Sequence, residues 1–374
     1  MARTIIVEPH PVGHRFEHVS WIARVALARG DDVELLTSVG ARSRDEFTTF
    51  LGDVPLTVHE EVEGYFPRPK VVGRALMELH RRSPITTLVL LDADQALKRW
   101  WLEAPLGLRG RRGPKTILLL MRLPQELSLT DLPALKMWAA KVSLTALTRA
   151  TRAADHIVYL VGRHESRSGW LLGQVRDPAI CTAHARDRAA LRQRYDLPAD
   201  RRLVGIIGDL SIRKCLPMVA EAIQRAGPDV DLLLAGKMTD DMRAWLEALP
   251  PAERARVHTR LGFLPDEELD AYVAASDVIS LALLNPGPSG IQGKALVAGV
   301  PTVSAGSRLR ERESSSHGAG LHVDLDAASL AGGIRRVLDR GSDPLATPDD
   351  VPTAAEFGEV MLGGRRPIRR EARR

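Results

Sequence analysis

The sequence predicts an α/β protein of two domains, each built around a doubly wound parallel sheet. Apolar strand patterns alternate with helix patterns in both halves of the chain, which is typical of βα units with parallel strands. A highly charged stretch, residues 185–202, interrupts this alternation, and the pattern then starts again. The length of 374 residues also suits two domains, because domains of about 100–200 residues are usual.

The first half begins with the strand pattern TIIVE over residues 4–8. An amphipathic helix pattern over 19–30 follows a loop, and the strand DVELLTS comes next at 32–38. This order predicts parallel strands joined by a right-handed crossover. Further strand patterns lie at 86–92, 115–121 and 155–161.

The second half repeats the alternation. Its strand patterns lie at 203–210, 229–236, 256–264, 277–284 and 301–305, with helix patterns at 216–227, 240–249, 266–276 and 291–299. We therefore expect Rossmann-like domains over 1–184 and 203–345, a linker over 185–202 and a C-terminal segment with a basic tail over 346–374.

Composition limits the partners and the compartment. The formal net charge of +5 favours anionic partners such as phosphates, and no nucleic-acid-binding motif is present. The two cysteines, Cys181 and Cys215, form no disulfide framework, and no apolar run approaches the roughly 20 residues of a membrane span. The N-terminus also lacks the apolar run of a signal peptide, so we expect a cytoplasmic protein.

Two loops of the second half suit a diphosphate. In GDLSIRKC (208–215), Gly208 lets the backbone approach a ligand, and Arg213 and Lys214 place two cations at the start of the next helix. In NPGPSGIQGKALVAGVPTV (285–303), Ser289 and neighbouring small residues precede a helix whose first N–H groups lack partners within the helix. Each loop alone also fits an ordinary turn, but two of them after strands of one sheet favour a phosphate ligand.

A third loop and a lysine add to this prediction. The stretch RLGFLPDEEL (260–269) places Gly262, Phe263 and Leu264 where backbone groups can line a nucleobase, although Phe263 fits a core position equally well. Lys294, in the helix after Ser289, can add a positive charge.

In this order the motifs resemble the nucleotide-sugar-binding domain of the group 1 glycosyltransferases, a large retaining family of GT-B fold. The matching run includes GDLSIRKC, DVDLLLAG, VHTRLGFLPDEELDAYVAAS and the helix that ends in GVPTV. VGHRFEHVSWIARVALARGDDVELLTS in the first half resembles the family's opening loop, helix and second strand. The resemblance implies two facing Rossmann-like domains, a nucleotide sugar held mainly on the second domain, and an acceptor that approaches from the first.

Site residues follow from the matching positions. Lys214 takes the place of the family's diphosphate lysine, and Gly208 that of the turn glycine. Residues 262–264 match the base loop, and Ser289, Gly290, Ile291 and Gln292 match the diphosphate-binding helix start.

Gly13 and His14 match the glycine-rich loop of the first domain, which implies that His14 acts beside Lys214 and Arg213 as a catalytic group. The resemblance implies no cofactor and no metal, because cations and a helix start neutralise the leaving diphosphate.

This sequence departs from the family at four positions. Pro286 and Lys294 stand where the family has two glutamates, Asp209 replaces an arginine beside the turn, and Arg122 replaces a histidine after a first-domain strand. Donor recognition is therefore expected to differ, or activity to have been lost. A non-catalytic homologue that acts as a binding or partner subunit is one alternative. A nucleotide-sugar 2-epimerase is another, because PSGIQGKA (288–295) resembles a Ser-Gly-Gly-Ile-Gln-Glu-Glu segment of the UDP-N-acetylglucosamine 2-epimerases.

Two other groups of residues carry less weight as metal sites. Asp92 and Asp94 form a D-x-D pattern, which we interpret as a structural loop after a strand. His10, His14 and His18 are spaced by four residues, but Pro11 and Gly13 interrupt any helix there.

The segment LKRWWLEAPLGLRGRRGPK (97–115) mixes tryptophan with basic side chains, which predicts either a solvated basic loop or a peripheral contact at the inner membrane face. The acceptor stays open among a glycan, a lipid-linked group and a small molecule.

Overall fold

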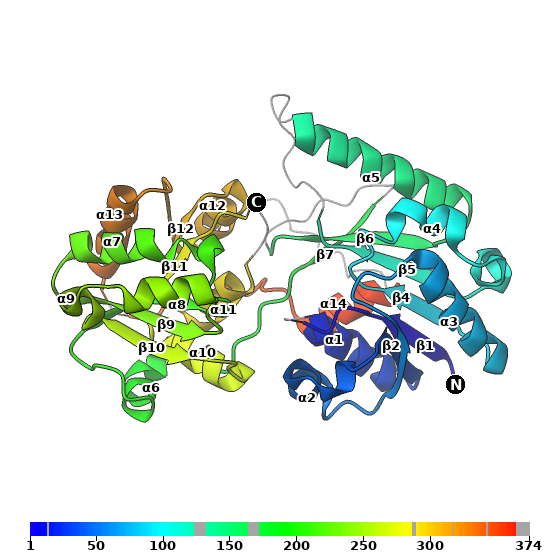
Figure 1. Ribbon diagram of the computed structural model, residues 1–374, viewed down its shortest axis with the longest axis horizontal. Helices are drawn as coiled ribbons and strands as arrows, with labels where there is room; N and C mark the ends of the chain where they lie inside the picture. The colour runs from blue at the N-terminus through cyan, green and yellow to red at the C-terminus, as the bar shows by residue number, and fades with distance from the viewer. Residues whose placement is uncertain are drawn as a thin grey trace. The chain divides into compact units, whose positions relative to one another are not determined.

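The computed structural model describes residues 1–12, 15–122, 132–163, 172–285, 289–316, 318–341 and 343–363. Within these ranges the chain forms two compact units. Unit 1 comprises residues 1–161, 172–176 and 353–363, and unit 2 comprises 162–163 and 177–352. Each unit contains one parallel sheet with helices on both faces (Figure 1). This confirms the predicted fold class of two doubly wound α/β domains.

Unit 1 has a seven-stranded sheet of order β3-β2-β1-β4-β5-β6-β7. Its strands are β1 (Arg3–Val7), β2 (Asp32–Ser38), β3 (Thr57–Val62), β4 (Thr87–Leu90), β5 (Lys115–Leu120), β6 (His156–Val161) and β7 (Gly173–Arg176). Its helices are α1 (Arg15–Ala28), α2 (Asp45–Leu51), α3 (Pro69–Arg82), α4 (Leu97–Glu103), α5 (Leu132–Ala150) and α14 (Ala354–Met361), with short 3₁₀ turns at Ala41–Ser43, Leu106–Leu108 and Gly110–Arg112.

Alternating side chains of the strands bury both faces of this sheet. On one face Ile6 and Leu35 share a cluster with Phe16 of α1 and Phe357 of α14. On the other face Ile5, Val7 and Leu36 pack with residues of α3 and α4. Successive strand residues point to opposite faces, so a strand buried on both sides is apolar throughout, as TIIV is here.

Helix α1 begins at Arg15, four residues before the expected start at residue 19. Phe16, Val19 and Ala23 are buried along one stripe of this helix. This spacing continues the helical period toward the N-terminus, so the core contact of Phe16 extends the helix. In the C-terminal segment, α14 begins with a capping box between Thr353 and Glu356 and packs on α1, so residues 353–363 belong to unit 1.

Unit 2 has a six-stranded sheet of order β10-β9-β8-β11-β12-β13. Its strands are β8 (Arg202–Ile207), β9 (Val230–Gly236), β10 (Val257–Leu261), β11 (Val278–Ala282), β12 (Thr302–Ala305) and β13 (Gly320–Val323). Its helices are α6 (Arg188–Arg194), α7 (Leu216–Ala226), α8 (Asp240–Glu247), α9 (Pro251–Arg254), α10 (Asp266–Ala275), α11 (Gly290–Ala298), α12 (Arg308–Ser316) and α13 (Ala327–Leu338), with 3₁₀ turns at Ala185–Asp187 and Ile212–Lys214.

The charged stretch 185–202, for which the sequence predicts a linker, lies inside unit 2. Its helix α6 packs on α10, and the buried Arg192 pairs with Asp277 at 2.6 Å while donating to the carbonyl of Ala275 at 3.0 Å. These charges bind within the fold instead of facing water. A charged composition therefore does not by itself mark a linker.

No helix in the described part of the chain combines the length and the apolar character needed to cross a bilayer.

Candidate functional site

The strand order of unit 2 places two loops at one point of its sheet edge. From β8 the sheet continues through β9 to β10 on one side, and from β11 through β12 to β13 on the other. The strands β8 and β11 pair directly, with Val278 opposite Val204. Ligands of open α/β sheets bind beyond the carboxyl ends of strands at such a reversal of strand order. The loops after β8 and β11 are the two loops that the sequence singled out for a diphosphate.

Gly208 lies at the centre of this edge. Its φ angle of 97° falls in the region that favours glycine, and its N–H donates to the carbonyl of Ala235 at 2.7 Å. A Cβ atom at Gly208 would lie 3.4 Å from Nζ of Lys214 and 3.8 Å from Cδ1 of Ile291. The ammonium group of one loop and the first turn of α11 therefore flank the same glycine.

Lys214 is half-buried, and its ammonium donates a hydrogen bond to the carbonyl of Ile207. Burial lowers the pKa of Lys214 from 10.5 to about 8; the cation Arg213 lowers it further, while Asp209 opposes the shift. The charged form of this lysine is thus incompletely compensated. An anion placed at Gly208 would stabilise it.

Arg213 extends its guanidinium to Asp209 at 2.6 Å, and both side chains are about half exposed. Asp209, which stands where the resembling family has an arginine, is therefore the ion-pair partner of Arg213. The carbonyl of Arg213 accepts the N–H of Leu284 at 3.0 Å, which fixes the loop after β8 against the loop after β11.

Helix α11 begins at Gly290 behind the N-cap residue Ser289. The hydroxyl of Ser289 accepts the N–H of Gln292 at 3.4 Å. Among the described residues, the N–H groups of Gly290 and Ile291 have no acceptor. They are available to an anion at the helix start.

Two residues predicted to bind the donor have other roles in the structure. The amide of Gln292 is buried and donates to the carbonyl of Arg310 at 3.2 Å and to Ser314 at 3.1 Å. Lys294 is also buried, and its ammonium lies 2.7 Å from Asp270 on α10. Its charge is therefore balanced inside the unit, and the lysine that replaces a family glutamate is an ion-pair partner in the core.

Arg310 on α12 supports the same loop, a contact that the sequence reading missed. Its buried guanidinium donates to the carbonyls of Asn285 at 2.8 Å, Leu283 at 2.7 Å and Ala305 at 3.2 Å. Arg310 belongs to the run RLRERES (308–314), which contains three arginines. Nothing in this run indicates which of them is buried.

The three residues of the loop 262–264 have different environments. Gly262, with φ of 131°, donates to the carbonyl of Gly236 at 3.0 Å, which ties this loop to the strand beside Gly208. Phe263 is 36% exposed and available to a ligand, whereas Leu264 is buried in the core with residues of α10. The predicted residues Gly13, His14 and Pro286 lie outside the described residues.

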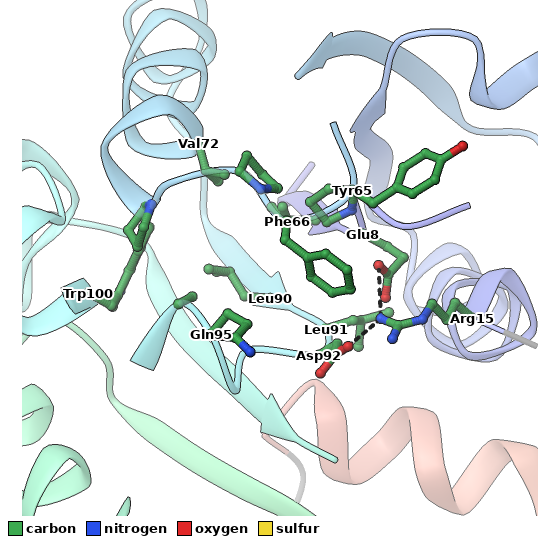
Figure 2. A pocket seen from close by; sticks show the side chains of 15 residues that line it. Glu8, Arg15, Tyr65, Phe66, Val72, Leu90, Leu91, Asp92, Gln95 and Trp100 are labelled. Carbon is green, nitrogen blue, oxygen red and sulfur yellow. Dashed lines mark ion pairs between the residues drawn. The ribbon is translucent and has the colours of Figure 1, made fainter. Parts of the chain in front are cut away.

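Unit 1 has a pocket at the equivalent place, where its strand order reverses between β1 and β4 (Figure 2). Glu8 follows β1 and Asp92 follows β4, and both line the pocket with Arg15 from α1. The guanidinium of Arg15 lies 2.5 Å from a carboxylate oxygen of Asp92 and 3.6 Å from one of Glu8. Tyr65, Phe66 and Trp100 contribute aromatic surface.

Burial controls the charge of Glu8, which is only 2% exposed. It raises the pKa of Glu8 from 4.5 to about 7, and the negative charge of Asp92 adds to this effect. Arg15 and the N–H of His10, at 2.9 Å, oppose the rise. The sequence reading missed Glu8 and Arg15, although a charged residue directly after a buried strand was a visible signal.

The D-x-D pattern separates in the structure. Asp94 accepts the N–H of Met121 at 2.7 Å and pairs with Lys141, as a structural loop residue does. Asp92 instead lines the pocket, which the structural interpretation of this motif did not include. In the basic segment, Trp100 is buried and donates to the carbonyl of Ala153, so it offers no surface to a membrane.

Comparisons with known proteins agree with this geometry. Residues 201–340 match the family of glycosyl transferases group 1. This match falls within unit 2. The chain is 25% identical over 219 residues to a 2-deoxystreptamine glucosyltransferase of Streptomyces kanamyceticus. That match covers 57% of the chain and 56% of the relative, so it spans little more than half of that protein.

Solved structures extend the similarity of fold from the matched residues 201–340 to nearly the whole chain. Sucrose-phosphate synthase of Thermosynechococcus elongatus matches with a TM-score of 0.65 and 18% identity, over 97% of this chain and 94% of that one. Anabaena HepE, in a complex with UDP, matches with a TM-score of 0.62 and 17% identity over 97% and 95%. Together with the glycosyltransferase match, these similarities identify the fold as GT-B.

Proposed function

We propose that the protein transfers a sugar from a nucleotide sugar to an acceptor. The observation that carries the proposal is the meeting of Lys214 and the start of α11 at Gly208, on the carboxyl edge of the unit 2 sheet. A diphosphate there would receive the ammonium of Lys214 and the N–H groups of Gly290 and Ile291. HepE, which shares the fold, has been solved with UDP and with UDP-glucose.

In this mechanism the protein stabilises the leaving diphosphate with its own charges. Lys214 and the dipole of α11 neutralise the negative charge that grows on the phosphate oxygens as the sugar leaves, so the proposal needs no metal and no cofactor. Arg213 adds a second cation once Asp209 releases it. Retention of the anomeric configuration is what the family resemblance implies.

A panel of UDP-, GDP-, ADP- and TDP-sugars tests the proposal through the melting temperature of the protein. A ligand that binds the folded state raises this temperature by mass action. We expect one base to give a clear shift that is retained in Arg243→Ala, an exposed cation on α8, and lost in Lys214→Ala. A panel without any shift, or a shift that survives Lys214→Ala, would contradict the proposal.

The replaced glutamates support a second candidate, a nucleotide-binding homologue without catalysis. Lys294, at one of these positions, is engaged with Asp270 and cannot act as a carboxylate. A nucleotide sugar that stabilises the protein but is not consumed with a broad set of acceptors would favour this candidate. Formation of an epimerised nucleotide sugar in the absence of any acceptor would instead indicate the epimerase.

We also propose peripheral contact with the inner membrane face through the segment 97–115. Leu102 and Leu106 are 64% and 84% exposed beside arginines that favour anionic lipid. Vesicles of phosphatidylglycerol should sediment the protein, and Leu102→Asp with Leu106→Asp should abolish this. Equal sedimentation of the double variant would exclude this segment as the contact.

A further inference from the structure

The pocket of unit 1 contains two carboxyl groups and one guanidinium. Arg15 lies between Glu8 and Asp92, as the two dashed ion pairs in Figure 2 show. A single positive charge cannot balance two carboxylates, and both carboxylate side chains are less than 10% exposed. The pocket therefore has a deficit of positive charge when both are ionised, and burial makes such a deficit costly.

Both carboxylates also have unused hydrogen-bonding capacity. Oε1 of Glu8 accepts the N–H of His10 and lies near Arg15, while its Oε2 has no hydrogen-bond partner among the described residues. Oδ2 of Asp92 faces Arg15, and its Oδ1 likewise has no partner in the described part of the chain. In their ionised form these oxygens only accept hydrogen bonds, so a ligand that donates hydrogen bonds suits them.

The remaining walls of the pocket suit a ring. Phe66 is 58% exposed and Tyr65 is 38% exposed, and both rings lie about 5 Å from that of His10. Val72 and Leu90 add aliphatic surface. Aromatic faces also attract a cation next to a ring.

We propose that this pocket binds an acceptor whose ring carries a protonated amine, with the ammonium group held by Glu8 and Asp92 and the ring against Phe66. The proposal rests on the proposed transfer function and names the substrate class of the acceptor. An ammonium supplies both the missing charge and up to three hydrogen-bond donors, whereas a hydroxyl supplies one donor and no charge.

Other charged groups near the pocket do not change this balance. Arg15 is engaged by the two carboxylates, and burial lowers the pKa of His10, so this ring is neutral near pH 7. Arg122 follows β5, is exposed and lowers the pKa of His10. A phosphate or carboxylate ligand would meet two carboxylates with one guanidinium between them, and repulsion disfavours it.

A matched pair of rings tests the proposal by direct binding. scyllo-Inosamine and scyllo-inositol differ only in an amine that replaces one hydroxyl. We expect the full-length protein to bind the amine at least about tenfold more tightly at pH 7 by isothermal titration calorimetry, because an ammonium donates charge-assisted hydrogen bonds to carboxylates and a hydroxyl donates neutral ones. Equal affinities, or no heat with either ring, would overturn the proposal.

Variants locate the effect. Glu8→Gln should reduce the preference for the amine to less than about threefold. Phe66→Ala should lower the affinity for scyllo-inosamine and for scyllo-inositol alike. Asp53→Asn removes an exposed carboxylate of the same unit and should leave the preference unchanged. A preference that persists in Glu8→Gln would exclude this pocket.

Titration of UDP into the same variants separates this proposal from the proposed function. If UDP still binds while scyllo-inosamine and scyllo-inositol bind with equal affinity, the transfer function stands. Only the proposal of an acceptor with a protonated amine is then refuted. If the unaltered protein bound none of UDP, GDP, ADP and TDP, the transfer function would be refuted, whether or not it bound either ring.

Discussion

Units 1 and 2 have the same kind of sheet and place their candidate sites at the same topological position, but the two sites differ in charge. In unit 2 the edge between β8 and β11 presents Lys214 and a helix start, which attract an anion. In unit 1 the edge between β1 and β4 presents Glu8 and Asp92, which favour a cation. The strand order therefore determines where a ligand binds, and a few loop residues determine its charge.

Burial acts on both sites in the same physical way. It lowers the pKa of Lys214 to about 8 and raises that of Glu8 to about 7, so each group moves toward its neutral form. Each unit thus contains an ionisable group, Lys214 or Glu8, whose charge is not fully compensated by neighbouring groups. Such groups reduce stability and are typical of functional sites.

Loss of Lys214 should give the largest effect on this comparison. We expect Lys214→Ala to lower the transfer rate at saturating donor by about 100-fold or more, because it removes charge stabilisation of the leaving diphosphate. The melting temperature should change little, since the lysine is poorly compensated. Steady-state kinetics with Arg243→Ala as the control measures this, and an unchanged kcat would break the assignment of unit 2.

The close approach of two loops in unit 2 predicts a strong backbone effect. A Cβ atom at Gly236, where φ is 135°, would lie 1.9 Å from the carbonyl oxygen of Gly208. We expect Gly236→Ala to lower the free energy of unfolding by about 3 kcal/mol. Gly262→Ala is the matched control, because φ there is 131° with no atom within 4 Å, and it should cost about 1 kcal/mol. Equal losses in urea unfolding would show that the approach to Gly208 does not matter.

In unit 1 the raised pKa of Glu8 predicts that its charge opposes folding. The folded protein holds this proton more tightly than the unfolded chain, so its contribution is complete below pH 4.5 and is lost as the pH rises through about 7. Glu8→Gln should therefore raise the free energy of unfolding by up to about 3 kcal/mol at pH 8 relative to its effect at pH 4.

Glu34→Gln in the same unit should show the opposite sign. Burial opposes ionisation of Glu34, but hydrogen bonds from Arg3 and His59 outweigh it and lower the pKa. Its contribution is present above the unfolded pKa and lost in acid. Denaturant titrations at several pH values compare the two variants, and a shared sign would contradict the contrast between them.

The smallest effect concerns donor affinity in alkali. Because only protonated Lys214 attracts a diphosphate, the affinity for UDP should fall as the pH rises through about 8, by about fivefold between pH 8 and pH 9. Binding near pH 8 should take up a proton, which calorimetry in buffers of different ionisation enthalpy detects. An affinity that is constant between pH 7 and pH 9 would mean that Lys214 does not contact the diphosphate.

Much of the architecture could be predicted because strand and helix patterns are local. The two α/β domains and the loops after β8 and β11 were predicted from such patterns, and the fold is confirmed. The strands β3, β7 and β13 were missed, because they are short and partly exposed. The stretch 185–202 was placed between the domains, because its charges give no sign of the buried pair between Arg192 and Asp277.

The same distinction between local patterns and long-range contacts applies to the site residues. The sequence by itself determined that Gly208, Lys214 and Ser289 follow strands and precede helices, since those positions depend on neighbours in the chain. Only the tertiary structure decided that Lys294 pairs with Asp270, that Arg310 holds the loop after β11, and that Glu8 and Asp92 share Arg15. These contacts join residues 7 to 77 positions apart in the sequence. The charge of each group depends on which partners folding brings within a few ångströms.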